Sequence, residues 1–471
     1  MQNKFKLKGV WFLPGSEERF NGYLTYSPTH GIQLELLGVL SEKNNKQYEQ
    51  EFIVGTTSDG KKITLHKCFS TKRSFSSNGF ETSNYDILFL FIGKHFSSMK
   101  DFQFSNISCE YKDFDNWLDL YGFTNIKYQK ETKETIHEYK QLDDMLFEIS
   151  DELQCKFKFD TYTTGSIHNA EAKIKQVCEV VLIPKQGSKE FEQLLSWFQT
   201  FTAFLTLAYF ERPLLNKLSL NIESISENDE KYFKEIELYY QREVLKKDYG
   251  KKNHRNYFLF VYKDIKENLE IILQKWFNAQ ALINPTIAGL TEAFIKREQV
   301  IEFKFLNIAH AIELYHRRTK SNEVVSKEIH KKKIEEIIDS VNPEYSLWLK
   351  RKLEFSNEPT LSERLEELIN EVPAKVKLIL FKPSIEEFIK QFKNTRNYYT
   401  HYSKKLEKKA LTNSELFNLT ERAKIFLVCI VLKEIGLNEA EITNIIFRKG
   451  VFLFNHIIKY DEVKKYFNDW N

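Results

Sequence analysis

The residues of this chain best suited to chemistry lie together in the segment 396–401, whose sequence is RNYYTH. Arg396 keeps its charge at physiological pH, and its planar fork of N–H donors fits the non-bridging oxygens of a phosphate. His401 can exchange a proton near neutral pH, which makes it a candidate general base or acid. Asn397 can orient His401 or the phosphate but is unsuited to proton transfer. The segment thus has the parts for acid–base chemistry at a phosphodiester, and we expect no metal and no cofactor.

Basic side chains flank this segment. Between residues 388 and 409 one acid, Glu407, is opposed by Lys390, Lys393, Arg396, Lys404, Lys405, Lys408 and Lys409. The asymmetry extends further, because residues 296–471 carry a net charge of +6 whereas residues 1–295 carry −3. A local excess of this size favours a polyanionic partner, although a solvated lysine face is the common explanation of any single lysine run.

The segment ends a predicted amphipathic helix that begins after Ser384. Ser384 with Glu387 has the spacing of a capping box, as do Thr360 with Glu363 and Thr412 with Glu415. On this helix the apolar residues Ile385, Phe388, Ile389 and Phe392 form one stripe, and Arg396 occupies the next position. A guanidinium on the buried side needs a partner, so a buried ion pair with Glu313 or Glu354 is an alternative to a catalytic role.

A helical wheel also places Arg396 and His401 on different faces of this helix. Arg396 and His401 are five residues apart, which is roughly 140° on an ideal helix, whereas Asn397 and His401 share a face. A straight helix therefore does not pair Arg396 with His401. We expect either that the helix bends or ends near Thr400, or that a second copy of the chain supplies the other residue.

An Arg and a His separated by four residues, with Asn after the Arg, resembles the active-site motif of HEPN-domain ribonucleases. The likeness covers about residues 295–471 and includes segment 305–318 (FLNIAHAIELYHRR), which resembles the first helix of these domains in ApeA-like proteins. It implies a helical bundle that dimerises so that two motifs converge, with Arg396, His401 and Asn397 at the catalytic site. Cleavage would proceed by attack of the RNA 2′-hydroxyl and leave a 2′,3′-cyclic phosphate.

The same resemblance assigns RNA-binding roles around the motif. The predicted RNA-binding residues are Lys393, Lys404, Lys405, Lys408 and Tyr399. Tyr398, Tyr399 and Tyr402 have rings that can stack on bases, but packing in the core or in a dimer interface is the favoured interpretation for at least two of them.

The patterns elsewhere predict an α+β fold, with a β-rich and mixed region at 1–290 and an all-α helical bundle at 295–471. Strands are expected at 31–40, 85–93, 156–164 and 173–184, and a hairpin is expected across Asp59-Gly60. A buried helix is predicted at 188–210, and helices follow almost without interruption from about residue 256, with charged loops at 317–333 and 357–359. A last helical segment is expected at 438–455, with some β-like character at 445–454. The opening residues 9–24 resemble the N-terminal domain of ApeA-type bacterial anti-phage proteins.

Composition and motifs exclude several other classes. No apolar run approaches the roughly 18 residues of a membrane helix, and the N-terminus lacks the pattern of a signal peptide. Five scattered cysteines without CxxC spacing indicate reduced thiols in a cytoplasmic protein. A Walker A sequence and a Gly-x-Ser-x-Gly elbow are absent from the sequence. His310 and His316 are interpreted as packing or surface residues.

These observations predict a metal-independent endoribonuclease that acts as a homodimer in abortive anti-phage defence. Its RNA substrate would be host tRNA or another cellular RNA, and residues 1–290 would sense a phage-derived trigger. Two alternatives remain open. The helical domain can bind RNA through its basic patch without cleaving it, or it can serve purely as a structural oligomer.

Overall fold

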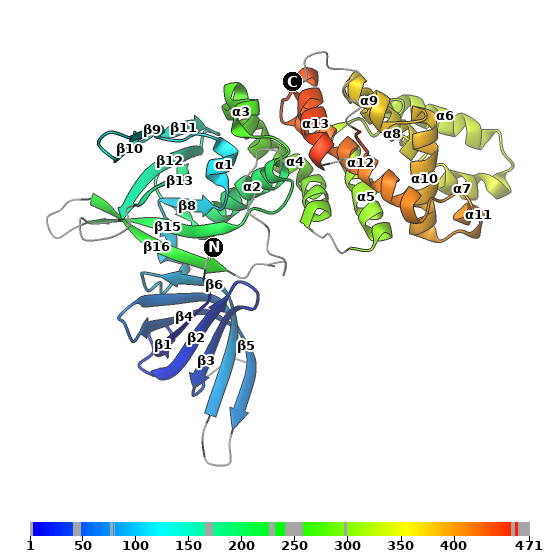
Figure 1. The fold of residues 1–471 in the computed structure, drawn as a ribbon. Coiled ribbons are helices and arrows are strands. Elements are labelled where there is room, and N and C mark those ends of the chain that lie inside the picture. Colours follow the sequence, from blue (N-terminus) through cyan, green and yellow to red (C-terminus); the bar gives the residue numbers. More distant parts are fainter. Residues whose placement is uncertain are drawn as a thin grey trace. The chain divides into compact units, whose positions relative to one another are not determined.

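The computed structural model of the 471-residue chain describes residues 3–40, 49–75, 79, 81–164, 173–225, 231–240, 258–295, 299–453 and 457–459. The chain divides into two compact units. The β-rich unit comprises Met1–Phe201 and Pro213–His254, and the helical unit comprises Thr202–Arg212 and Arg255–Asn471. The predicted α+β class, with a β-rich region followed by a helical one, is confirmed (Figure 1).

Six antiparallel strands at the start of the chain close into a barrel (Figure 1). They are β1 (Phe5–Phe12), β2 (Phe20–Ser27), β3 (Gly31–Leu37), β4 (Glu49–Thr57), β5 (Lys62–Phe75) and β6 (Glu81–Ile92). Their order is β6-β3-β2-β1-β4-β5, and β5 pairs again with β6. The predicted hairpin joins β4 to β5, and Gly60 has the positive φ, +82°, that a tight hairpin turn requires. The strands expected at 31–40 and 85–93 are found as β3 and β6.

The barrel is filled by large apolar side chains from alternate strand positions. Trp11 is the largest of them and is fully buried. It lies opposite Gly55 in the pairing of β1 with β4. A Cβ atom at Gly55 would lie 2.3 Å from Cε3 of the Trp11 indole, so the glycine leaves the space that the indole fills.

The sheet of the β-rich unit continues from β6 through its pairing with β16. The added strands follow the order β16-β15-β8-β13-β12-β11. The remaining elements of this part of the chain are β7 (Gln103–Phe104), β8 (Asn106–Tyr111), α1 (Phe114–Leu118), β9 (Phe123–Gln129), β10 (Glu134–Tyr139), β11 (Met145–Glu148), β12 (Leu153–Thr164), β13 (Lys173–Pro184), β14 (Lys189–Glu190), α2 (Phe191–Tyr209), β15 (Leu215–Ile225) and β16 (Lys231–Tyr240). The predicted strands at 156–164 and 173–184 and the predicted helix at 188–210 are therefore confirmed as β12, β13 and α2.

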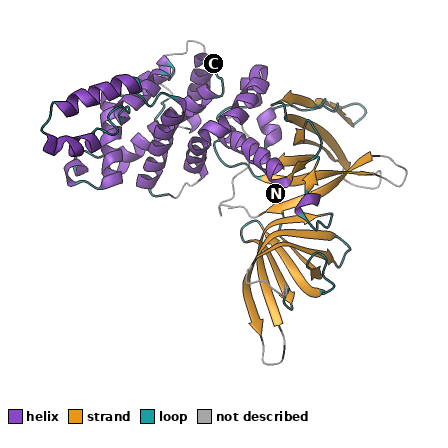
Figure 2. Ribbon diagram, turned by 180° about the vertical axis from the view of Figure 1, so that it is seen from behind, coloured by secondary structure: helices purple, strands orange, loops and turns teal. Residues whose placement is uncertain are grey.

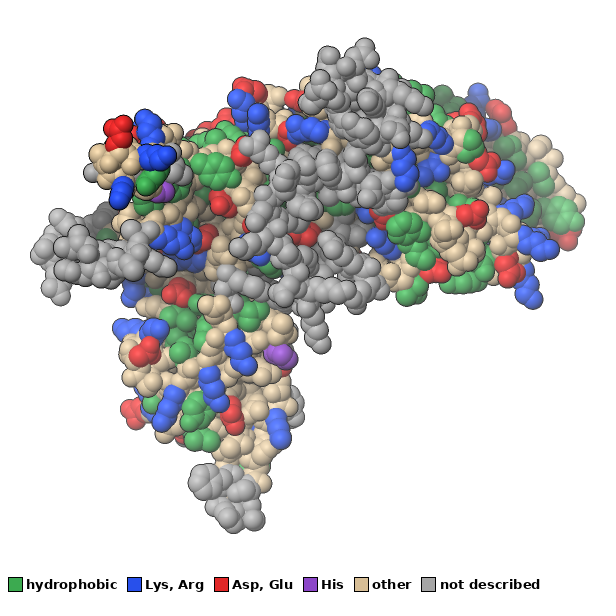
Figure 3. All heavy atoms as spheres, viewed as in Figure 1, with side chains coloured by type: hydrophobic (Ala, Val, Ile, Leu, Met, Phe, Trp, Pro, Cys, Tyr) green, Lys and Arg blue, Asp and Glu red, His purple; other side chains and the backbone are tan. Residues whose placement is uncertain are grey.

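Helices are drawn in purple in Figure 2, where those of the helical unit lie together. Its later helices are α3 (Tyr262–Ile265), α4 (Leu269–Ile295), α5 (Ile301–Thr319), α6 (Lys327–Asp339), α7 (Pro343–Lys352), α8 (Leu361–Asn370), α9 (Ala374–Leu380), α10 (Ile385–His401), α11 (Lys404–Glu407), α12 (Asn413–Glu434) and α13 (Glu439–Leu453). Helix α12 is the centre of the bundle, because its residues 423–432 are all buried and it packs against α4, α5, α9 and α13. Charged side chains of both signs are interspersed over the face drawn in Figure 3.

One local prediction in this unit was wrong. The loop expected at 317–333 is partly helical, since α5 runs to Thr319 and the Ser326 side chain accepts a hydrogen bond from the Ile329 amide at the start of α6. The last helical segment, expected at 438–455, is found as α13, which also includes the residues of β-like character up to 453.

None of the helices in the described ranges combines the length and the apolar character needed to cross a membrane.

The substitution Gly55→Val tests the packing of the barrel. It would place a branched side chain where the Trp11 indole lies, so we expect the unfolding free energy of the β-rich unit to fall by about 1–3 kcal/mol. Urea unfolding followed by circular dichroism measures the change. The control is Lys8→Ala, an exposed position on β1, which should stay within about 0.5 kcal/mol of wild type. Equal unfolding midpoints for Gly55→Val and wild type would contradict the packing described.

Candidate active site at the end of helix α10

The sequence of α10 explains where the helix begins and which face it buries. The Ser384 side chain accepts a hydrogen bond from the Glu387 amide at 3.2 Å, as predicted for this cap. The predicted capping box at Thr360 and Glu363 is also present, whereas Thr412 precedes α12 without a side-chain cap bond. Phe388 and Phe392 of α10 are buried, and Phe392 packs against Phe305 of α5.

The helical wheel predicted that the buried stripe of α10 continues at Arg396, and this prediction was wrong. Thr395 and Tyr399 are both buried, while Arg396 lies at the margin of the stripe with 28% of its side chain exposed. The stripe continues at Thr395 and Tyr399 because both residues bond the segment that follows α10. The Leu411 amide donates to the Thr395 hydroxyl at 3.1 Å, and the Tyr399 hydroxyl donates to the Leu411 carbonyl at 3.1 Å. These two bonds hold the segment after α10 against this face of the helix.

The end of α10 places His401 at the surface. The helix extends through His401 and stops because Tyr402 adopts a left-handed conformation with φ of 48°. The expected end of the helix near Thr400 is thus observed. His401 is exposed and makes no hydrogen bond to Arg396, to Asn397 or to any other residue that the structure describes. One copy of the chain therefore does not join the Arg and the His, and the contribution of a second copy stays a prediction.

Arg396 forms the ion pair that the sequence offered as an alternative. Its Nη2 atom donates to Glu313 Oε2 at 2.8 Å, whereas Glu354 is exposed and is not its partner. Its Nη1 atom donates to Asn397 Oδ1 at 3.1 Å, so Asn397 orients the guanidinium and not the imidazole. The other N–H groups of Arg396 have no partner among the described residues.

Glu313 also serves a second arginine. Arg317 lies one turn further along α5, and its Nε atom is 3.6 Å from Glu313 Oε1. Arg317 Nη1 donates to Glu358 Oε2 at 2.8 Å, and Arg364 Nη2 donates to the same oxygen at 3.4 Å. Arginines and glutamates thus alternate from Arg396 to Arg364. Three guanidinium groups thus share the carboxylates of Glu313 and Glu358.

The far end of these ion pairs is buried. Arg364 and His316 are 1% and 0% exposed. Arg364 Nη1 donates to His316 Nδ1 at 2.8 Å and to Asn322 Oδ1 at 2.7 Å. Since a guanidinium cannot accept, Nδ1 is the acceptor, and the imidazole carries its proton on Nε2, which donates to Glu367 Oε2 at 2.7 Å. Burial lowers the pKa of His316, and the charge of Arg364 acts in the same direction against the hydrogen bond to Glu367.

Sequence reasoning named Glu313 but missed Arg317, Glu358 and Arg364. Arg364 could have been found by the same wheel that singled out Arg396. It lies on the apolar face of α8 beside Leu365 and Leu368, both buried. The expectation that His316 packs within the helices holds, although its contacts are polar.

The predicted RNA-binding lysines are not paired with acidic side chains in the described part of the chain. Lys393, Lys404, Lys405 and Lys408 are exposed, and none forms an ion pair with a carboxylate in the described part of the chain. Tyr399 differs, because its ring is only 8% exposed and its hydroxyl is bonded to Leu411. Little of that ring is left to stack on a base, so the predicted stacking role of Tyr399 is corrected to packing. Tyr402, which packs beside Tyr398 with 65% of its surface exposed, is the open ring at this end of the helix.

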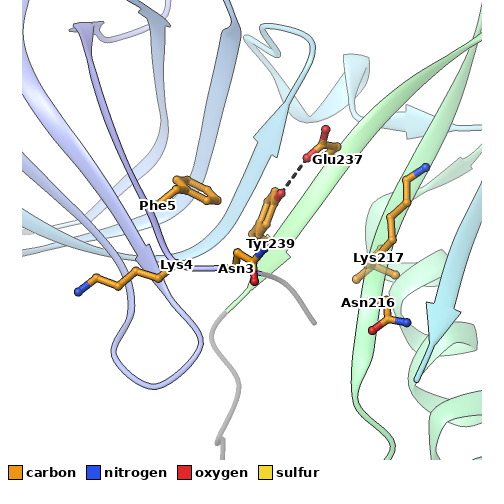
Figure 4. Close-up of a pocket in the computed structure, with 8 residues that line it drawn as sticks. Asn3, Lys4, Phe5, Asn216, Lys217, Glu237 and Tyr239 are labelled. Atoms are coloured by element: carbon orange, nitrogen blue, oxygen red, sulfur yellow. Dashed lines mark hydrogen bonds between the residues drawn. The ribbon is translucent and has the colours of Figure 1, made fainter. Parts of the chain in front are cut away.

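A hollow of about 270 Å³ lies elsewhere, in the β-rich unit, between the start of β1 and strands β15 and β16 (Figure 4). Two of its charged groups are already engaged, since Lys217 pairs with Glu235 at 2.5 Å and Glu237 accepts a hydrogen bond from the Tyr239 hydroxyl at 2.8 Å. Figure 4 shows Lys4 and Lys217 extending away from each other. The hollow thus lacks a converging set of catalytic groups, and the candidate site remains at α10.

The buried imidazole predicts a pH dependence of stability. The pKa of His316 in the folded state lies below its ordinary value of about 6.5, so the unfolded chain takes up the proton first as the pH falls. Stability from this group is complete above about pH 6.5 and is lost below it, by at most about 1.4 kcal/mol per pH unit. His316→Gln keeps an acceptor for Arg364 and a donor for Glu367 but cannot titrate. Urea unfolding at pH 5 and pH 7.5 should therefore show a smaller loss for the variant than for wild type, and equal losses would contradict the assignment.

Two family matches cover most of the chain. Residues 6–276 match the family described as ApeA N-terminal domain 1, and residues 306–441 match the family described as Apea-like HEPN. The second match contains Glu313 and the whole segment 396–401. No curated protein and no solved structure gives a significant match. Since the first match alone extends over more than half of the chain, the protein belongs to the ApeA family and carries an ApeA-like HEPN domain.

Proposed function

We propose that this protein is a metal-independent endoribonuclease of HEPN type that cleaves RNA with Arg396 and His401. One observation carries the proposal. Among the described residues, Glu313 and Asn397 each accept one N–H of the Arg396 guanidinium, so its other donors can bond a ligand from solvent, and His401 is exposed at the end of the same helix.

Electrostatics supports a polyanionic substrate at this end of α10. Lys393, Lys404, Lys405 and Lys408 are exposed around the motif and form no ion pair with a carboxylate in the described part of the chain. Such a concentration of charge attracts the RNA backbone through its phosphates. Tyr402 offers an exposed ring on which an unpaired base can stack.

In the proposed reaction His401 takes the proton of the RNA 2′-hydroxyl. The 2′-oxygen then forms a bond to the adjacent phosphorus, the bond from phosphorus to the 5′-oxygen breaks, and a proton is delivered to the departing 5′-oxygen. The products are a 2′,3′-cyclic phosphate and a 5′-hydroxyl. Arg396 stabilises the negative charge that builds on the non-bridging oxygens, and Asn397 keeps the guanidinium oriented.

The separation of Arg396 and His401 within one chain favours a composite site. A base and an acid are both needed, and each chain offers one His401 at the end of α10. In a dimer one imidazole can act as base while the second copy's imidazole acts as acid. We therefore infer a homodimer in which two copies of the segment 396–401 share one substrate.

Membership of the ApeA family supports a role for the proposed activity in anti-phage defence. A phage-derived trigger would act on the β-rich unit, and cleavage of cellular RNA such as tRNA in the cytoplasm would stop growth of the infected cell. The trigger must control the helical site, because unrestrained cleavage would harm the host.

Replacement of the two motif residues tests the chemistry. His401→Ala and Arg396→Ala should each lower the rate of RNA cleavage by about 10²–10⁴-fold, because each removes a group that acts in the transition state. Purified protein is incubated with total RNA, and 3′ ends are mapped for cyclic phosphate. His310→Ala, an exposed histidine on α5, is the matched control and should keep full activity. EDTA should leave wild-type cleavage unchanged.

The rival functions give different results in the same assay. Salt-dependent RNA binding with no cleavage by wild type would assign the helical domain to RNA binding, and no affinity at low salt would leave a structural oligomer. A fully active His401→Ala variant, or loss of wild-type activity with chelator, would overturn the mechanism proposed.

Glu313 should act as a positioning residue in this reaction. Glu313→Gln removes the carboxylate charge that Arg396 and Arg317 share, so the guanidinium is held less firmly while the site gains net positive charge. We expect kcat to fall by about tenfold or more and KM for RNA to stay level or fall at low salt. Steady-state kinetics separates the two constants. A rise in KM at unchanged kcat would show that Glu313 serves substrate binding and not the placement of Arg396.

A further inference from the structure

Helices α6 and α7 form a hairpin that has no buried residue of its own. The two helices contact each other, and their inner side chains are half-buried. Large apolar side chains on and beside the hairpin are exposed, and they include Val324, Ile329, Tyr345, Leu347, Trp348 and Phe355. Trp348 alone has 60% of its surface open. In Figure 3 hydrophobic side chains lie among charged ones at the end of the helical unit where Figure 1 labels α6 and α7.

The two ends of the hairpin are bonded to each other. Asn357, which follows α7, bonds Val325, which precedes α6, because its Nδ2 atom donates to the Val325 carbonyl at 2.8 Å and its Oδ1 atom accepts from the Val325 amide at 3.1 Å. His330 is bonded to the Ser356 hydroxyl at 2.9 Å. The hairpin thus forms an arm whose apolar surface is covered by no other described part of the chain. Such exposure is unusual for a side chain as large as that of Trp348.

Charge is distributed unevenly along this arm. The tip, residues 334–344, contains the acids Glu335, Glu336, Asp339 and Glu344 and no basic residue. The stem, residues 327–333 and 345–355, contains Lys327, Lys331, Lys332, Lys333, Lys350, Arg351 and Lys352 against Glu328 and Glu354. In the described part of the chain Glu336, Asp339, Glu344, Lys332 and Arg351 form no ion pair. An acidic tip and a basic stem complement each other when two identical arms lie antiparallel.

We propose that the α6–α7 hairpin is the surface through which a second copy of this chain docks. A two-fold axis places the acidic tip of each arm on the basic stem of the other and covers Tyr345, Leu347 and Trp348 between them. Such an isologous contact uses the same patch twice, as closed homodimers do. A different protein whose surface carries charge of one sign would complement either the tip or the stem of the arm, but not both. Charge complementarity therefore favours a second copy of the arm itself.

The arm is connected to the candidate site by the ion pairs already described. Glu358 at its base receives Arg317 and Arg364, and Arg317 shares Glu313 with Arg396. Docking through the arm therefore brings two copies together at the end of the helical unit where α10 also ends. This part of the inference rests on the proposed function, because it supplies the second copy of His401 that the reaction needs.

Charge reversal with complementation tests the docking. One variant reverses the tip (Glu336→Lys, Asp339→Lys, Glu344→Lys) and another reverses the stem (Lys332→Glu, Lys350→Glu, Arg351→Glu), both in the full chain. Sedimentation velocity should show a wild-type dimer and should show that the dissociation constant of each variant is raised about 100-fold or more. An equimolar mixture of the two variants should regain the dimer, because both tip–stem contacts are then of opposite charge. The control variant Glu366→Lys, Glu415→Lys, Glu439→Lys changes the net charge equally at exposed positions outside the arm and should stay dimeric.

Each other outcome overturns the proposal. A monomeric wild type, or variants that dimerise as wild type does, would remove the arm from the interface. A monomeric wild type whose Trp348 is instead needed to float with anionic vesicles, or to retain a different protein, would assign the surface to that partner.

RNA cleavage by the same proteins separates this inference from the proposed nuclease function. If both hold, each reversed variant loses cleavage and the mixture regains it. If wild type is a dimer that does not cleave RNA, the nuclease proposal fails while the docking surface stands. If monomeric variants cleave as fast as wild type, docking through the arm does not complete the site.

Discussion

The ion pair between Arg396 and Glu313 is the interaction on which the candidate site depends. A guanidinium at the margin of a helical core must be paired or hydrated, because its transfer from water is costly. Glu313 meets this need from α5, the helix against which α10 packs through Phe305 and Phe392. The ion pair therefore fixes where the Arg396 guanidinium lies against α5. The remaining N–H groups of Arg396 have no partner among the described residues.

The sharing of carboxylates extends this effect beyond one pair. Glu313 and Glu358 each bond two arginines, and Glu367 is linked to Arg364 through His316, so Arg396, Arg317 and Arg364 belong to one set of polar contacts. A buried guanidinium without partners would destabilise the fold. Arg364 lies inside the fold, where it also fixes the tautomer of His316, whereas Arg396 lies at the margin of the core with donors that bond no described residue.

Sequence patterns predicted features that depend on neighbouring residues. Alternation located β12 and β13, the Asp59-Gly60 turn located the β4–β5 hairpin, and Ser384 located the start of α10. Predictions failed where distant contacts decide. Arg396 lies beside the buried stripe because Leu411 bonds Thr395 and Tyr399, and nothing in the local period of α10 reveals that contact. Likewise, Arg317 and Glu358 are 41 residues apart, so their pairing is invisible to a helical wheel.

The arm formed by α6 and α7 shows how stability and assembly can be linked in such a fold. Two helices of 13 and 10 residues are marginal in water when they bury no residue fully, because nucleation of a helix is costly and packing normally repays that cost. Here the base is fixed by Asn357 and by the arginines on Glu358, and the outer surface is left apolar. Since Glu358 at the base of the arm bonds Arg317, and Arg317 shares Glu313 with Arg396, the arm and the candidate site are joined by one set of ion pairs.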